Sequence, residues 1–236
     1  MERSALITLS AINGALYATV GYFTYLGILA PMIGVVRFWP SVVIPAVFTV
    51  AFGPLVGGLG AAIGIFISDM LIHGNALLSL TVGVPANFIC FYLMGKLYEA
   101  EARLAMTSSL AIQCAPLVII MALSYLSIIS RRAAIVLEGA CAASLALSTV
   151  IAKAFKEWRT YILAASASLM VGSFIVGFGV WLFSQCFVLP TGSHNLPLMA
   201  AVIWFIWTYA TEIPFLIAFV PPIIWALRQA GWGHVR

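Results

Sequence analysis

The sequence predicts an all-α fold, a polytopic bundle of transmembrane helices, from three observations. Hydrophobic residues make up 64% of the 236-residue chain and charged residues only 8%, whereas soluble domains have about 45–50% and about 25% respectively. The apolar residues fall into stretches of about 20, the length that crosses a bilayer as a helix. Polar or proline-containing breaks separate these stretches. The composition excludes a soluble enzyme, a nucleic-acid-binding module and a disordered chain.

Four membrane-entering segments are expected in the first hundred residues. The second is unusually short: about 14 residues reach only about 21 Å as a helix, less than the roughly 30 Å of hydrocarbon. The dipeptide Gly53-Pro54 ends it, and a polar patch at residues 73–75 ends the third. We therefore expect segments at 5–29, 39–52, 55–71 and 78–95.

Four more segments are expected in the rest of the chain. The last is long and contains Pro214, Pro221 and Pro222, which cannot donate a backbone hydrogen bond and are expected to interrupt it. No polar stretch is long enough for a soluble domain, so residues 1–236 are expected to form one membrane domain. These segments are expected at 104–130, 133–152, 161–187 and 198–227.

The positive charges predict an orientation, because cytoplasmic loops are enriched in Lys and Arg. Eight segments place both termini on one side, and a cytoplasmic N-terminus and C-terminus put Arg37, Arg131 and Arg132 outside. The other eight of the eleven basic residues then lie inside: Arg3, Lys96, Arg103, Lys153, Lys156, Arg159, Arg228 and Arg236. A six-span alternative, in which residues 104–152 do not form two full spans, keeps the Arg131-Arg132 pair inside.

Small residues recur every four positions in the first segment, at Ala11, Gly14, Ala15 and Ala18. That spacing lets another helix approach closely. The approaching helix belongs either to this bundle or to a second protein, and both alternatives stay open from the residues alone.

Titratable residues inside apolar segments are costly and suggest function. Asp69 and His73 are four residues apart, on one face if the helix continues, and Asn75 follows. Glu212 lies halfway along the last segment, just before Pro214, which exposes polar backbone near the carboxylate. The competing interpretations are an interfacial residue for Asp69 and a structural hydrogen bond for Glu212.

Tryptophans lie where a bilayer interface or a ligand would meet them. Trp204 and Trp207 fall in the outer half of the last segment, and Trp39 closes the first outer loop. Interfacial aromatic belts explain such positions, and so does a stacking wall for a flat ligand.

Catalytic signatures are missing from the sequence: it contains no His-Glu-x-x-His, no Gly-x-Ser-x-Gly and no phosphate-binding loop. We therefore expect no catalytic residues, no metal site and no cofactor bound by this chain, and we do not expect an enzyme.

Four motifs occur in order along the chain: Arg37-Phe38-Trp39-Pro40, Phe52-Gly53-Pro54 with Gly57-Gly58, Gly64 and Asp69, Leu80 to Asn87 with Gly95-Lys96-Leu97, and Glu212-Ile213-Pro214-Phe215 with Pro221-Pro222 and Leu227-Arg228. This ordered set resembles the S-component of energy-coupling factor transporters, the membrane subunit that binds the substrate. The family usually has six helices, so the resemblance implies that residues 5–96 and 160–228 correspond to its core and 104–152 to an inserted hairpin.

The resemblance implies a subunit in a prokaryotic cell membrane that captures a vitamin-sized molecule from outside. It works with a transmembrane coupling subunit and two cytoplasmic ATPases, which use the ATP. The first helix is the docking surface, here Ala11 and Ala15 with Gly14 and Ala18, and residues 35–39 form a lid. Together with the residue chemistry above, it predicts these substrate-binding residues: Arg37, Trp39, Asp69, His73, Asn75, Asn87, Trp204, Trp207 and Glu212.

Two other functions remain open at this point. A self-contained secondary transporter or channel needs an ion relay, for which Asp69, Glu138 and Glu212 are few and dispersed. An assembly protein of the membrane would use the first helix as its interaction face. Riboflavin, thiamine, biotin, folate, cobalamin precursors and queuosine precursors are all carried by such S-components, and the sequence favours none of them.

Overall fold

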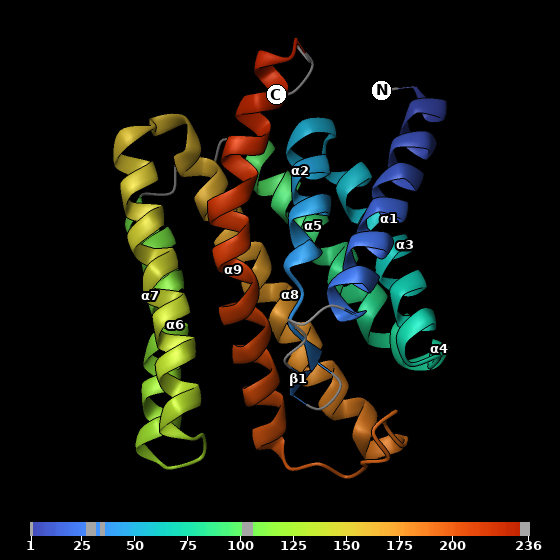
Figure 1. Ribbon diagram of the computed structural model, residues 1–236, viewed down its shortest axis with the longest axis vertical. Coiled ribbons are helices and arrows are strands. Elements are labelled where there is room, and N and C mark those ends of the chain that lie inside the picture. The colour runs from blue at the N-terminus through green and yellow to red at the C-terminus, as the bar shows by residue number, and fades with distance from the viewer. Residues whose placement is uncertain (1, 27–31, 34–35, 101–105, 232–236) are drawn as a thin grey trace.

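The computed structural model describes residues 2–26, 32–33, 36–100 and 106–231, which form the helical bundle of Figure 1. Seven helical spans are long and apolar enough to cross a membrane, and Pro40–Phe52 is a shorter apolar helix. The elements are α1 (Arg3–Leu26), β1 (Met32–Ile33), β2 (Val36–Arg37), η1 (Pro40–Val42), α2 (Val43–Phe52), α3 (Pro54–Ile72), α4 (Ala76–Leu78), η2 (Ser79–Gly83), α5 (Val84–Glu99), α6 (Met106–Tyr125), α7 (Arg131–Ala154), η3 (Lys156–Trp158), α8 (Arg159–Cys186) and α9 (Leu198–Gln229).

The all-α bundle with eight segments is confirmed. Successive segments run in opposite directions, and both ends of the chain lie at the top of Figure 1. The turns that join α6 to α7 and α8 to α9 lie at the opposite end, called the loop end below. Arg131 and Arg132 begin α7 there, which fits eight segments rather than six. Arg103 and Arg236, used for the predicted orientation, lie outside the described residues.

A glycine reverses the chain between the short segment and the next span. Gly53 has a φ of +98°, in the left-handed region that favours glycine, and its N–H caps α2 on the Thr49 carbonyl at 2.9 Å. Pro54 then starts α3, where a missing N–H costs nothing. The predicted break at Gly53-Pro54 therefore folds α2 back beside α3.

Glycines of α3 let α1 pack directly against it. A Cβ at Gly60 would overlap the Asn13 side chain, and one at Gly64 would lie 2.7 Å from the ring of Tyr17. Asn13 is fully buried in this contact and donates from Nδ2 to the Val56 carbonyl at 3.0 Å. The close approach thus gives the Asn13 amide N–H an acceptor on α3, which it would lack in lipid.

This packing corrects part of the predicted docking surface. A Cβ at Gly14 would lie 2.8 Å from Ile63 of α3, and Ala18 is 5% exposed. Both residues are buried inside the bundle, where no partner protein can reach them. Ala11 and Ala15 lie on the exposed face of α1, so only these two of the four predicted residues remain accessible.

The next span, Ala76–Glu99, contains one wide π turn at Ser79–Gly83. Pro85 has no N–H to give to the carbonyl four residues earlier, and the Val84 N–H reaches back five residues to the Ser79 carbonyl. Such single π turns are frequent at functional sites, and residues of this one line the cavity described below.

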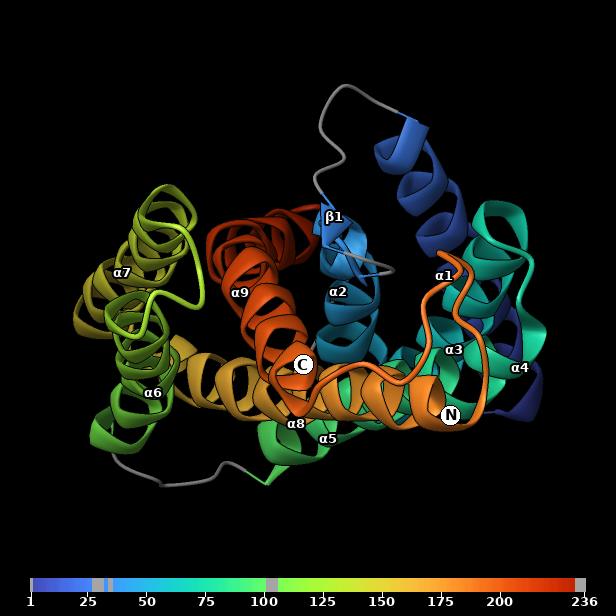
Figure 2. The same cartoon turned by 90° about the horizontal axis from the view of Figure 1, so that it is seen from below.

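The two helices α6 and α7 form a hairpin within the predicted range 104–152, and residues 104–105 lie outside the described part. The two helices pack on α8 and α9 at one edge of the bundle (Figure 2). Buried Gln113 of α6 donates to Ser148 Oγ of α7 at 3.1 Å and to Ser166 Oγ of α8 at 3.0 Å. One amide therefore ties the hairpin to the rest of the bundle.

The last helix, α9, is continuous, so the predicted interruptions at its prolines are wrong. Pro214, Pro221 and Pro222 all lie inside it, whereas the sequence predicts interruptions at these positions. Transmembrane helices tolerate prolines when neighbouring helices satisfy the freed backbone groups. Buried Tyr161 of α8 donates to the Leu216 carbonyl at 2.9 Å and so ties α8 to this stretch, although the carbonyls that the three prolines leave free are those of residues 210, 217 and 218.

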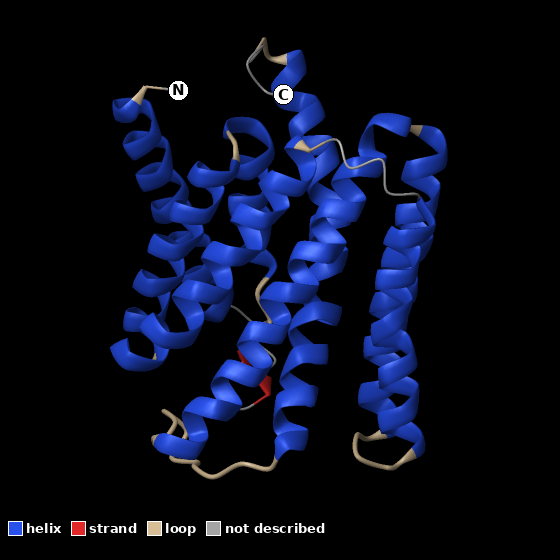
Figure 3. Cartoon of the chain, turned by 180° about the vertical axis from the view of Figure 1, so that it is seen from behind, coloured by secondary structure: helices blue, strands red, loops and turns tan. Residues whose placement is uncertain are grey.

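A two-residue β ladder lies against the helices between α1 and α2. β1 and β2 pair antiparallel, with Ile33 opposite Val36, and Figure 3 shows them inset between helices on the side of the loop end. Val36 is buried together with Leu78, Val180 and Trp204. The hairpin is thus packed into the bundle.

Candidate binding cavity

A cavity opens between β2, α3, the π turn, α5, α8 and α9. Its volume is about 800 Å³, including the space at its open entrance. Helices α6 and α7 contribute no lining residue. The walls consist of Tyr17, Val36, Arg37, Trp39, Ile65, Asp69, His73, Leu78, Val82, Gly83, Ala86, Asn87, Cys90, Phe91, Leu169, Gly172, Ser173, Val176, Val180, Thr208 and Glu212.

Six of the nine residues predicted to bind a substrate line this one cavity. They come from four separate parts of the chain, and only the fold brings them together: Arg37, Trp39, Asp69, His73, Asn87 and Glu212. That they contact a substrate remains a prediction.

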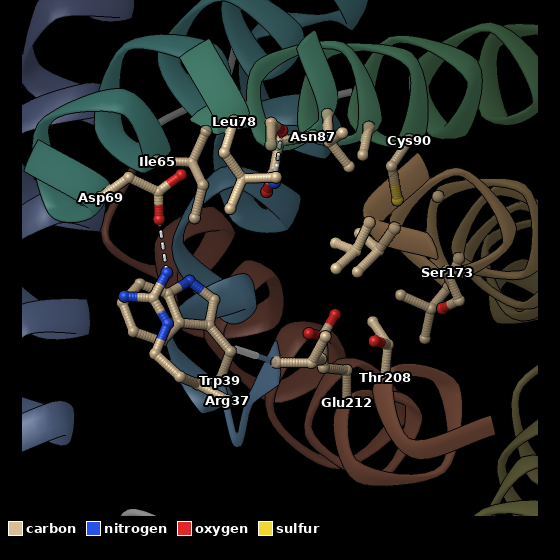
Figure 4. A pocket seen from close by; sticks show the side chains of 18 of the residues that line it. Arg37, Trp39, Ile65, Asp69, Leu78, Asn87, Cys90, Ser173, Thr208 and Glu212 are labelled. Carbon is tan, nitrogen blue, oxygen red and sulfur yellow. Dashed lines mark hydrogen bonds and ion pairs between the residues drawn. The ribbon is translucent and has the colours of Figure 1, made fainter. Parts of the chain in front are cut away.

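An ion-pair cluster forms one end of the cavity (Figure 4). Asp69 forms an ion pair with Arg37 and accepts a hydrogen bond from the Ser79 hydroxyl at 2.7 Å. Its other neighbour is His73 Nε2 at 3.4 Å, so the predicted four-residue spacing does place both side chains on one face. The Arg37 guanidinium also lies over the Trp39 ring, 4.7 Å from its centroid. The cluster fastens the β hairpin to α3.

Asn75 has a structural contact instead of a place in the cavity. Its Oδ1 accepts from the Leu78 N–H at 2.9 Å and caps α4. Its own N–H donates to His73 Nδ1 at 3.1 Å. Asn75 therefore shapes the turn beside the cavity and does not line it.

Tyr17 lines the cavity and connects three elements there. It was not among the residues predicted from the sequence. Its hydroxyl donates to Asn87 Oδ1 at 2.8 Å and accepts from Trp39 Nε1 at 2.9 Å. Asn87 in turn donates to the Gly83 carbonyl at 3.0 Å. A signal was present, because Asn13 and Tyr17 are four apart and mark one polar, inward face of an otherwise apolar helix.

Glu212 lies at the other end of the cavity, with Thr208 and Ser173 near it (Figure 4). Glu212 is 8% exposed. No described residue forms a hydrogen bond or ion pair with its carboxylate. The Ser173 hydroxyl also lacks a partner in the described part of the chain. Thr208 donates to the Trp204 carbonyl at 2.9 Å. Unsatisfied buried polar groups are costly, which makes this end a place for a bound polar group.

The two predicted stacking tryptophans lie outside the cavity walls. Trp204 is 4% exposed and packs with Val36, Val180 and Leu189 near the loop end. Trp207 packs partly against the same group and partly against the cluster formed with α6 and α7. Both tryptophans lie in the half of α9 nearer the loop end, but neither lines the cavity as the sequence predicts.

Apolar side chains form much of the remaining cavity wall. Val82 belongs to the π turn, Phe91 to α5, and Leu169, Val176 and Val180 to α8. The α8 wall, including Ser173, was missed because its sequence contains no titratable residue. A wall that combines apolar side chains with a few polar groups suits a small molecule with a ring or other apolar body.

The comparisons with known proteins returned no relative: no protein-family model matches the chain, no curated protein matches it, and no solved structure matches it.

Proposed function

We propose that this polytopic membrane protein is the substrate-binding subunit of an energy-coupling factor importer. It captures a vitamin or related micronutrient and delivers it with a coupling subunit and two ATPases. The observation that carries the proposal is the cavity, where the β hairpin, α3, α5, α8 and α9 converge and an ion pair and an unpartnered carboxylate lie at opposite ends.

The origin of the cavity walls supports this function. Every lining residue falls between Tyr17 and Phe91 or between Leu169 and Glu212. These ranges lie within 5–96 and 160–228, the parts of the chain that resemble S-components. The inserted α6–α7 hairpin packs on the far side of α8 and α9 and leaves the cavity untouched.

The exposed face of α1 supports a docking role. Ala11 and Ala15 lie on it, one turn apart, while the opposite face holds α3. Small residues at this spacing on a lipid-facing surface allow a second helix to approach closely. In the proposed orientation both termini are cytoplasmic and the cavity opens toward the outside of a prokaryotic cell membrane.

The distribution of titratable groups favours a binding subunit over a self-contained transporter. Asp69 and His73 lie together at one end of the cavity and Glu212 at the other, while Glu138 belongs to α7, which does not line it. No chain of titratable groups crosses the described part of the bundle, so the energy for uptake is expected from a partner.

Copurification tests the docking role. The chain is expressed in its host with an affinity tag, and a coupling subunit with an ATPase pair is expected to copurify. Ala11→Trp and Ala15→Trp should each abolish that copurification. Ala142→Trp is the matched control, because Ala142 is an equally small, exposed residue on α7. Retention of the partners by both α1 variants, or their absence from the wild-type preparation, would contradict the proposed function.

A further inference from the structure

Glu212 indicates which class of substrate the cavity takes. We infer that the cavity binds an organic monocation with an apolar, ring-sized body, whose protonated nitrogen pairs with the Glu212 carboxylate. The role of this preference in uptake rests on the proposed function. The preference for a positive charge is a property of the cavity itself and can be measured on the chain alone.

The charges of the cavity walls give the first argument. Arg37 and Asp69 form an ion pair and neutralise each other. Among the Asp, Glu, Lys and Arg side chains of the described residues that line the cavity, Glu212 is the one with no opposite charge beside it. A buried carboxylate without a counter-charge is strongly unfavourable, and a cationic ligand removes that cost by supplying the missing charge.

The orientation of Glu212 gives the second argument. The residue is 8% exposed, and its side chain points into the cavity rather than toward α8 or α1 (Figure 4). Its lone pairs therefore face the space that a ligand would fill. A carboxylate accepts hydrogen bonds and donates none, so the matching group is an N–H donor, and a charged donor makes the stronger bond.

The groups around Glu212 refine the ligand. The hydroxyl of Ser173 lacks a partner in the described structure and lies at the same end, so it can bind a second polar atom beside the cationic nitrogen. Val82, Val176 and Val180 then form an apolar wall. An amidinium or a protonated amine attached to an aromatic ring has this combination of charge, second N–H and apolar body.

Three isosteric probes separate charge from shape. Benzamidine, benzamide and benzoate share one ring and carry a positive, zero and negative charge. Binding to the purified full-length chain is measured by calorimetry in detergent, and its thermal unfolding is recorded with each probe. We expect benzamidine to bind at least about tenfold more tightly than the other two, which is the size of one charge-assisted contact.

Glu212→Gln is the diagnostic variant, because it keeps the size and removes the charge. It should remove the preference for benzamidine, lowering that affinity by at least about tenfold. Glu138→Gln is the matched control, since it removes a carboxylate from α7, outside the cavity, and should leave the preference intact. An unfolding temperature near that of the wild type shows that Glu212→Gln remains folded, and Glu212→Asp, which keeps the charge, should retain the preference.

The inference is overturned if benzamide or benzoate binds as tightly as benzamidine, if none of the three binds, or if Glu212→Gln keeps the wild-type preference. These outcomes are distinct from failure of the proposed function. A chain that prefers benzamidine but copurifies with no coupling subunit binds a cation without being an S-component, whereas a chain with partners and no charge preference is an S-component for another class of substrate.

Discussion

The hydroxyl of Tyr17 is expected to hold the β hairpin over the cavity, and Tyr17→Phe tests this. The hydroxyl is buried, accepts from Trp39 Nε1 and donates to Asn87 Oδ1. Removing it leaves the indole N–H and the amide oxygen unpaired while keeping the ring that packs between α1, α3 and α5. The variant therefore isolates two hydrogen bonds from the surrounding packing.

The magnitude follows from those two bonds. Each buried group left without a partner costs about 1–3 kcal/mol. The arrangement in which Trp39 and the β hairpin lie against the bundle, called closed here, should therefore be destabilised by at least about 2 kcal/mol. At about 1.4 kcal/mol per factor of ten, the population of the open hairpin rises about 30-fold. Hydrogen exchange followed by mass spectrometry measures this as faster exchange of the amides at residues 36–39.

Tyr22→Phe is the control for this experiment. Tyr22 lies on the same helix, and its hydroxyl forms no hydrogen bond with a described residue, so its removal should leave exchange at residues 36–39 unchanged. The hydroxyl does not hold the hairpin if Tyr17→Phe speeds that exchange by less than about threefold, which corresponds to about 0.7 kcal/mol, or by no more than the control does.

Two stability predictions follow from the ion pair and from the helix packing. Asp69→Asn leaves Arg37, which is 10% exposed, without its counter-charge and should lower the free energy of unfolding by about 3–5 kcal/mol. Glu99→Gln removes one partner of a more exposed ion pair and should lower it by less than about 1 kcal/mol. Denaturant unfolding in detergent compares them, and equal losses would contradict a buried, coupled pair. Gly60→Leu overfills the contact between α1 and α3 and should cost at least about 1–3 kcal/mol. Gly139→Leu, on a helix face with no atom within 4 Å of the added Cβ, should be near neutral, so equal melting temperatures for the two glycine variants would refute the close packing.

The sequence alone predicts the segments well, because hydropathy and chain breaks are local properties. Gly53-Pro54 does end the short α2, and the eight segments lie within a few residues of the predicted ranges. The prolines of α9 show where local reasoning fails. Pro214 removes a hydrogen bond in any context, but whether the helix breaks there depends on neighbouring helices, which the sequence does not display.

The candidate site was predicted in part for a related reason. Titratable residues in apolar sequence are conspicuous, and Asp69, His73 and Glu212 do meet at one cavity. The direction of a tryptophan on α9 depends on how that helix is rotated in the bundle, so Trp204 and Trp207 were misplaced. Ser173 lies on the α8 wall, which was not predicted, because an uncharged serine in an apolar segment is not conspicuous in the sequence.

Accumulation of a solute in liposomes tests whether this chain imports its substrate only with a coupling subunit and an ATPase pair. The small molecule that the purified chain retains is first identified by native mass spectrometry. Its uptake is then measured with this chain alone, and with the coupling subunit, the ATPase pair and ATP inside the vesicles. We expect accumulation only when all of these components are present. Equal accumulation by the chain alone, driven by an ion gradient, would contradict it.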